Sequence, residues 1–290
     1  MKASVTLRAP AKLNLSLEVL NRVDGGLHAL RSVMVPVDLC DEIQIDPSED
    51  GLHFSCSDKA LQADNLVERA YHALGSDRGA ATIALRKNIP TQAGLGGGSS
   101  DAAAILLAAQ RGIFGDVRQT DFLATARELG SDVPFFLAET AALVEGTGER
   151  ITALGRVPDW HAVIVKPPVA VSTAEAYRAL DERERATRPR KGSVSLALGE
   201  ALQRAEFDRV VELLNNDFLE VFARNAEIAR ALDMLRSAGA VKPMLTGSGS
   251  AVFALARTAP DRDALAKRIA PAPEYQVFAC AFWSGEAWTR

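Results

Sequence analysis

The most constraining feature of the sequence is a glycine cluster that runs directly into an apolar, helix-forming stretch. Residues 94–98 read Gly-Leu-Gly-Gly-Gly, and Ser99-Ser100-Asp101 leads into an alanine-rich run that ends near Gln110. Glycine lacks a Cβ atom and tolerates positive φ, so successive backbone N–H groups can converge on one point. The free N–H groups of the following helix point the same way, and we expect Ser99 or Ser100 to cap it. The segment Pro90–Ala103 is therefore predicted to bind phosphate.

The loop matches neither of the two commonest phosphate-binding fingerprints. No G-x-x-x-x-G-K-[ST] occurs in the chain, and Ser99 stands where the pattern G-x-G-x-x-G requires its third glycine. On local sequence alone, a flexible glycine hairpin or a plain helix entry remains an alternative interpretation. Support for phosphate chemistry has to come from the rest of the chain.

The rest of the chain mixes strand and helix patterns. Leu13, Leu15, Leu17 and Val19 alternate with Lys12, Asn14, Ser16 and Glu18, which predicts a strand with one apolar and one polar face. Helices are expected over residues 65–74 and 120–129, and further strands over 162–165, 252–255 and 275–281. Thr173–Leu180 is predicted to be helical, and the mixed charges of 181–191 are typical of a solvated helix end and loop. These patterns indicate an α+β protein with two lobes.

Composition excludes several functional classes. The formal net charge of -4 and the absence of a basic stripe argue against a nucleic-acid partner. The three cysteines lie far apart, so neither a disulfide framework nor a zinc site is expected. The first twenty residues lack a signal-peptide core, and the most apolar stretch is too short to span a bilayer. We therefore expect a cytoplasmic protein with no membrane partner. The oligomeric state is not fixed, and a homodimer is left open.

The glycine loop and several further motifs resemble those of the GHMP kinase superfamily. The loop looks like the phosphate loop of that family. The other matching motifs, in chain order, are Ala9–Leu15, Asp64–Val67, Gly130–Phe136, Val171–Tyr177 and Gly247–Ser250. The set is most similar to the branch that phosphorylates a cytidine diphosphate derivative of methylerythritol in the non-mevalonate route to isoprenoids.

The resemblance implies a two-lobed GHMP kinase fold. Residues 1–158 would form the N-terminal, ATP-binding domain with a ribosomal protein S5-like arrangement. Residues 159–290 would form a ferredoxin-like C-terminal domain. The implied activity is transfer of a phosphoryl group from ATP, with Mg²⁺, to the 2-hydroxyl of the cytidyl substrate, giving the 2-phosphate and ADP.

The resemblance also implies a catalytic pair and a nucleotide site. Asp132 would be the base and Lys12 its partner, while Asn14, two residues along the same strand face, would contact the acceptor. A lysine ammonium beside an aspartate holds the carboxylate ionised and stabilises charge on the transferring phosphoryl group. From local sequence alone, Asp132 as a helix cap and Lys12 as a surface lysine stay open. The implied ATP contacts are Asn65, Lys87, Pro90, Ala93, Gly94, Leu95, Gly96, Gly97, Gly98, Ser99, Ser100 and Asp101, and no Mg²⁺ ligands are assigned.

The substrate end departs from the family pattern. The family has Arg-x-Asp-Gly-Tyr-His, in which the aromatic ring stacks on cytosine and the histidine bonds the base edge. This chain reads Arg22-Val-Asp-Gly-Gly-Leu27-His28, with one extra residue and leucine in place of tyrosine. Losing a base–aromatic stack removes about 1–3 kcal/mol of binding. His28, Leu27, Thr173 and Tyr177 are the predicted substrate contacts, with Tyr177 a candidate replacement stack.

Two other functions stay open. The fold could serve another hydroxyl acceptor, such as mevalonate, homoserine or a sugar, and the altered Leu27 stretch is the feature that favours this. The chain could also be a non-catalytic nucleotide-binding relative, which loss of Lys12 or Asp132 would have favoured. Both residues are present.

Overall fold

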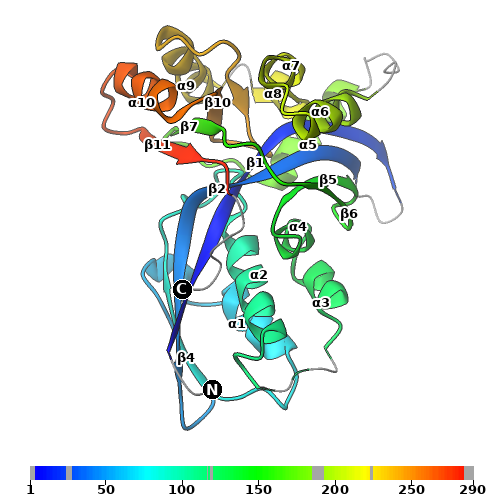
Figure 1. Cartoon of the computed structure of the whole chain (residues 1–290), viewed down its shortest axis with the longest axis vertical. Coiled ribbons are helices and arrows are strands. Elements are labelled where there is room, and N and C mark those ends of the chain that lie inside the picture. Colours follow the sequence, from blue (N-terminus) through cyan, green and yellow to red (C-terminus); the bar gives the residue numbers. More distant parts are fainter. Residues whose placement is uncertain are drawn as a thin grey trace.

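The computed structural model describes residues 4–23, 28–115, 117, 120–184, 193–222 and 225–283. Within them, a seven-stranded sheet and a four-stranded sheet are covered by helices, which confirms the predicted α+β class (Figure 1). No helix in these described ranges is long and apolar enough to cross a bilayer.

Two long antiparallel strands form the centre of the larger sheet. β1 runs over Val5–Arg22 and β2 over His28–Pro47, and the alternating residues 12–19 predicted as a strand lie within β1. β2 is long enough to pair with β4 (Ala81–Arg86) at one end and with β5 (Ala141–Gly146) at the other. The sheet is completed by β3 (Leu52–Cys56) on β4 and β6 (Arg150–Gly155) on β5.

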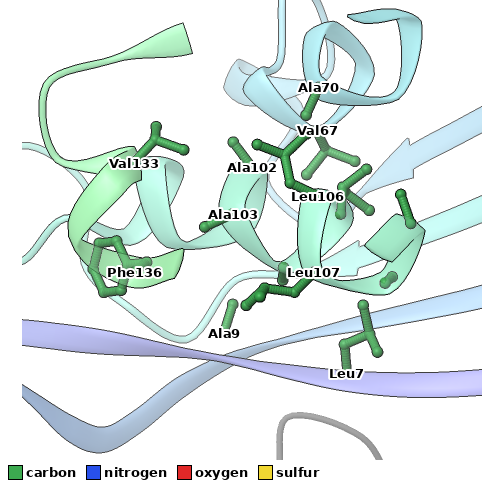
Figure 2. Packing of buried hydrophobic residues seen from close by; sticks show 14 of the residues in the cluster. Leu7, Ala9, Val67, Ala70, Ala102, Ala103, Leu106, Leu107, Val133 and Phe136 are labelled. Carbon is green, nitrogen blue, oxygen red and sulfur yellow. The ribbon is translucent and has the colours of Figure 1, made fainter. Parts of the chain in front are cut away.

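Helix α2 (Gly97–Gln110) lies at the centre of the first lobe. Its residues 100–109 are all buried, and it packs between β1, α1 (Leu66–Ala73), α3 (Phe122–Leu129) and α4 (Val133–Leu137). Figure 2 shows Ala102, Ala103, Leu106 and Leu107 lying between the strands and α1. Small alanine side chains let neighbouring elements pack closely against the helix, and the lack of polar side chains over residues 102–109 suits a helix that is buried on all sides.

The start of α2 differs from the prediction. Gly96, with φ of 72°, occupies the N-cap, and the helix begins at Gly97 rather than at Ser99 or Ser100. No side chain accepts a hydrogen bond from the first turn, because glycine carries no acceptor. The first N–H groups of α2 are thus left for a ligand or solvent.

The second lobe is an antiparallel sheet with helices around it. Its strand order is β11-β7-β10-β9, and several helices precede or connect these strands. The strands are β7 (His161–Lys166), β9 (Met244–Leu245), β10 (Val252–Ala256) and β11 (Gln276–Ala281), and the helices are α5 (Thr173–Glu184), α6 (Val194–Gln203), α7 (Phe207–Leu213), α8 (Phe218–Phe222), α9 (Ala226–Ser237) and α10 (Ala259–Arg268).

The two lobes are joined by backbone pairing and by a shared core. β8 (Asn215–Asn216) adds to the first lobe's sheet by pairing in parallel with Ser16 and Leu17 of β1. Leu13 of β1 also packs in one apolar cluster with Ile164 and Phe253 of the second sheet. The domain boundary near residue 158 stays a prediction.

The polar face of β1 is buried, not solvated. Lys12, Asn14, Ser16 and Glu18 are each almost inaccessible to solvent. The Glu18 carboxylate accepts from Ser193 Oγ at 2.6 Å and from Ser195 N at 3.0 Å, which lowers its pKa in spite of its burial. Buried polar groups are normally hydrogen-bonded, so this face of β1 forms a buried hydrogen-bond network and is not exposed to solvent.

The glycine loop is wedged against the second lobe at Gly94. Gly94 has φ of 74°, and a Cβ atom there would lie 2.3 Å from the backbone oxygen of Thr246. Gly112 has a similar φ of 79°, but a Cβ atom at that position would have no neighbouring atom within 4 Å.

Gly94→Ala should therefore destabilise the fold by about 1–3 kcal/mol more than Gly112→Ala. Both variants carry the cost of a left-handed alanine, and only the first adds a backbone clash. Urea unfolding of the two variants measures the difference. Equal losses of unfolding free energy would contradict the packing of this loop against Thr246.

Candidate active site

A cleft of about 1360 Å³ runs between the two lobes and collects most of the predicted site residues. Its lining draws on β1, the glycine loop, the start of α4, α5 and the turn between β9 and β10. The predicted residues that line it are Lys12, Asn14, His28, Asn65, Lys87, Pro90, Ala93, Gly94, Leu95, Gly96, Gly97, Gly98, Ser99, Asp101, Asp132, Thr173 and Tyr177. Leu27 lies outside the described residues.

Ser100 is the predicted site residue that lies away from the cleft lining. It is fully buried, and within the described chain its Oγ has no hydrogen-bond partner. Its backbone N–H donates to Gly96 O at 2.9 Å, inside the first turn of α2. This position gives no support to a contact through its hydroxyl, whereas Ser99, one residue earlier, does line the cleft.

The glycine loop is held from both sides by backbone hydrogen bonds. Lys12 N–H donates to Leu95 O at 3.0 Å, and Ala251 N–H donates to Ala93 O at 3.1 Å. A Cβ at Gly96 would lie 3.1 Å from the Lys12 and Phe136 side chains. The loop is thus clamped between β1 and the second lobe, which fixes the direction of its N–H groups.

Lys12 and Asp132 face each other across the cleft. Lys12 Nζ lies 3.9 Å from Asp132 Oδ2, and its ammonium also donates to Asn14 Oδ1. The lysine side chain is 3% exposed and the aspartate 30%. Burial lowers the pKa of Lys12, and the nearby negative charge of Asp132 opposes that shift. Lys12 therefore contacts both of the residues predicted to act with it.

Asn14 connects this pair to the second lobe. Its Nδ2 donates to Ser32 Oγ at 2.8 Å, and its backbone N–H donates to Thr246 Oγ1 at 3.0 Å. Thr246 precedes the Gly247–Ser250 motif, whose carbonyl at Gly247 accepts from Asn216 Nδ2 at 2.9 Å. The amide of Asn14 is consequently fixed in orientation before any acceptor binds.

Lys87 forms a buried ion triad beneath the loop. Its ammonium donates to Asp41 and, at 2.7 Å, to Asp101 Oδ2. Asp41 Oδ1 also accepts from Ile89 N at 2.8 Å, which ties the segment before the loop to β2. The Lys87 charge is thus neutralised within the protein, a role that sequence reasoning did not foresee.

His28, at the start of β2, and Tyr177, on α5, meet in the cleft. Their rings are stacked with centroids 5.1 Å apart and an interplanar angle of 16°. Burial, with a smaller effect of the Asp132 charge, raises the pKa of Tyr177 to about 12. Thr173 Oγ1 lies 3.0 Å from Ser248 Oγ and so joins α5 to the glycine turn of the second lobe.

Asp181 lines the cleft, although the mixed charges of residues 181–191 predicted a solvated helix end and loop. The helix expected to end at Leu180 continues to Glu184, so Asp181 lies within α5, one turn after Tyr177. It lines the cleft and contacts His28 and Arg22. The i, i+4 spacing from Tyr177 was the available signal, and the charge-rich stretch that follows masked it.

The buried triad pairs one lysine, Lys87, with two aspartates, Asp41 and Asp101, so full ionisation of all three would leave a net charge of -1 inside the protein. Burial, with a contribution from Asp41, raises the pKa of Asp101 to about 8 although Lys87 opposes the shift. The folded protein therefore binds a proton here that the unfolded chain, with an ordinary aspartate, releases near pH 4. The free energy of unfolding should fall as pH rises from about 4 to about 8.

Asp101→Asn should flatten this slope, because asparagine has no proton to release. Chemical denaturation at several pH values measures it, and Asp208→Asn is the control because the Asp208 side chain is 90% exposed. A slope in Asp101→Asn equal to that of the parent protein would contradict the assignment of the proton to this triad.

Comparisons with known proteins identify the family. The family model described as GHMP kinases N terminal domain matches residues 65–140, and the model GHMP kinases C terminal matches 198–273. A 4-diphosphocytidyl-2-C-methyl-D-erythritol kinase of Deinococcus radiodurans is 39% identical over 90% of this chain and 87% of the relative. The enzyme of the same name from Geobacter metallireducens is 38% identical over 95% of this chain and 98% of the relative.

Solved structures agree in fold. A crystal structure of 4-(cytidine 5'-diphospho)-2C-methyl-D-erythritol kinase matches with a TM-score of 0.79 and 34% identity, over 95% of this chain and 99% of that one. A homoserine kinase from Cytophaga hutchinsonii matches with a TM-score of 0.70 at 20% identity, over 98% of this chain and 97% of that one, which shows the shared fold alone. The chain belongs to the GHMP kinase superfamily, in the family of 4-diphosphocytidyl-2-C-methyl-D-erythritol kinases.

Proposed function

We propose that this protein transfers the γ-phosphoryl group of ATP to the 2-hydroxyl of 4-diphosphocytidyl-2-C-methyl-D-erythritol. The products are the 2-phosphate and ADP, in the non-mevalonate pathway of isoprenoid precursor synthesis. The observation that carries the proposal is the Lys12–Asp132 pair, 3.9 Å apart, beside a clamped glycine loop in the same cleft. The identity of the acceptor is inferred from the names of the relatives described above.

Phosphoryl transfer requires positioning and charge stabilisation more than covalent chemistry by the protein. The glycine loop and the uncapped N-terminus of α2 would hold the phosphates of ATP through backbone N–H groups. Asp132 would accept the proton of the acceptor hydroxyl as the oxygen attacks the γ-phosphorus. Lys12 would stabilise the negative charge on the transferring group, and its burial makes this interaction stronger than it would be in water.

Asn65 and Lys87 are the other cleft residues predicted to contact the nucleotide. The Asn65 side chain caps α1 by accepting from Val67 N and also donates to Leu61 O, so its place at the cleft is rigid. Lys87 would act mainly by holding Asp101 and Asp41 beneath the loop. A backbone cradle of this kind suits phosphate in a protein of net negative charge.

Magnesium would arrive with the phosphates of ATP. No cluster of three or more His, Cys, Asp or Glu that could hold a metal ion occurs among the described residues. Mg²⁺ in kinase sites keeps several waters and takes only one or two protein ligands besides phosphate oxygens, so the cleft fits this mode of binding. Ser99, which lines the cleft at the start of α2, is the hydroxyl we assign to it.

The acceptor would bind with its cytosine toward His28 and Tyr177 and its hydroxyl toward Asp132. Asn14 would contact the methylerythritol part through an amide that already bonds Ser32. Thr173, held by Ser248, would complete the wall between the two ends of the acceptor. The stacked pair of rings supports an aromatic base at this end of the cleft.

Asp132→Ala should lower kcat by a factor of about 10²–10⁴ with little change in affinity for ATP. The protein offers a matched control, because Asp132 and Asp121 stand at the N-caps of consecutive helices. Asp121 accepts from Leu123 N and Ala124 N, whereas the Asp132 side chain makes no capping bond.

Asp121→Ala should accordingly cost about 1 kcal/mol of stability and leave kcat unchanged. Steady-state kinetics and thermal unfolding of both variants separate the two roles. Near-normal turnover in Asp132→Ala would show that this carboxylate is not the base.

Acceptor identity is tested by ADP release across a panel of alcohols. We expect ADP release that depends on the cytidyl substrate and is absent with mevalonate, homoserine or galactose. Turnover with one of those three instead would replace the proposed acceptor. Binding of ATP without turnover on any acceptor would favour a non-catalytic relative.

A further inference from the structure

The carboxylate of Asp181 joins α5 to the ends of both central strands. Its Oδ1 lies 2.7 Å from His28 Nε2, at the start of β2, and its Oδ2 accepts from Arg22, at the end of β1. Tyr177, which stacks on His28, lies one turn earlier on the same helix. One turn of α5 thus controls both the face and the edge of the His28 ring.

The His28 ring has little freedom to reorient. Its side chain is 5% exposed, and its stacking partner Tyr177 packs edge-on against Phe218 with centroids 5.0 Å apart. The Phe218 side chain is itself buried at the start of α8. Rotation of the imidazole would break the stack and the contact with Asp181 together.

The partner of Nε2 decides where the ring proton lies. A carboxylate only accepts hydrogen bonds when ionised, and the hydrogen bond from Arg22 holds the pKa of Asp181 below its ordinary value. Nε2 of His28 must then carry the hydrogen, and the neutral ring presents a lone pair at Nδ1. Within the described chain no hydrogen bond engages Nδ1, and His28 lines the cleft.

We propose that Asp181 is a positioning residue that sets the pyrimidine specificity of the acceptor site through His28. With Nδ1 held as an acceptor, the ring takes a hydrogen bond from the 4-amino group of cytosine. Uracil has a carbonyl oxygen at that position, which places two acceptors against each other. This inference rests on the proposed function, since it concerns the base of the same acceptor.

The first test measures binding without turnover. Cytidine 5'-diphosphate and uridine 5'-diphosphate are titrated into the protein by calorimetry, with the nucleotide site filled by a non-hydrolysable ATP analogue. The parent protein should prefer the cytidine compound, and Asp181→Ala should reduce this preference about tenfold, the effect of one directional hydrogen bond. Glu182→Ala is the matched control, because it removes the same charge from the next position of α5 at an exposed site outside the cleft lining.

The second test asks whether Asp181 acts through His28. In a double-mutant cycle, Asp181→Ala should change the preference in the parent protein and have no further effect in a His28→Ala background. Nitrogen-15 NMR of the histidine rings should show His28 protonated at Nε2 in the parent protein and a mixture of tautomers in Asp181→Asn, which keeps the side-chain volume. Affinity for the ATP analogue reports whether each variant is folded.

The outcomes separate this inference from the proposed function. A parent protein that binds neither diphosphate, or binds both equally, overturns this inference, whereas the proposed function fails only if the cytidyl substrate gives no ADP release. A clear cytidine preference that survives Asp181→Ala and Asp181→Asn overturns the role of Asp181 alone. Additive effects in the double-mutant cycle would likewise exclude action through His28.

Discussion

The pairing of β1 with β2 over nearly their whole length determines where the functional groups of this protein lie. Cross-strand register sets Lys12 opposite Pro36 and Asn14 opposite Met34, in the middle of the pair. The far end of the same ladder carries Arg22 opposite His28. A strand advances about 3.3 Å per residue, so the ten residues from Lys12 to Arg22 separate the two ends of the acceptor site by roughly 30 Å of chain at most. The antiparallel ladder, with register shifts after Asn14 and after Val19, therefore sets the spacing between the proposed reacting centre and the proposed base-binding end.

Burial of the polar face of β1 explains why this ladder also joins the lobes. Side chains such as Asn14 and Glu18 cannot stay buried without partners. In the second lobe, Thr246 Oγ1 donates to Asn14 Oδ1 at 3.4 Å, and Ser195 N, at the start of α6, donates to the Glu18 carboxylate. The same contacts that satisfy these groups hold the glycine turn after Thr246 against Gly94 of the phosphate loop. One hydrogen-bond network thus stabilises the lobe interface and orders the proposed catalytic groups. A substitution that weakens the interface is therefore expected to disturb the positions of those groups as well.

The sequence predicted those parts of the protein whose signal is local. The glycine loop, the alternation of β1 and the apolar stretch of α2 each depend on neighbouring residues, and each lies where it was expected. Three other features depend on contacts distant in sequence. Alternation predicts that β1 has a polar face but not whether solvent reaches that face. The start of α2 at Gly97 depends on the packing of Gly96 against Lys12. The inward direction of Asp181 depends on how α5 meets His28. The first two leave no periodic trace in the chain, and the i, i+4 spacing of Asp181 from Tyr177 is masked by the charge-rich stretch that follows.

The two ends of the cleft differ for the same reason. The phosphate end is built from backbone N–H groups, which only glycine-rich sequence and a helix start can supply, so its signature is strong and shared by kinases with different acceptors. The proposed acceptor end consists of side chains from β1, β2 and α5, and equivalent chemistry can be reached with different residues. A leucine at position 27 therefore weakens the family pattern without removing the aromatic surface, because Tyr177 and His28 provide it from two separate elements. In our proposal, specificity for the base depends on how α5 is held against β1 and β2. Asp181 is the α5 side chain that contacts both strands, at Arg22 and at His28.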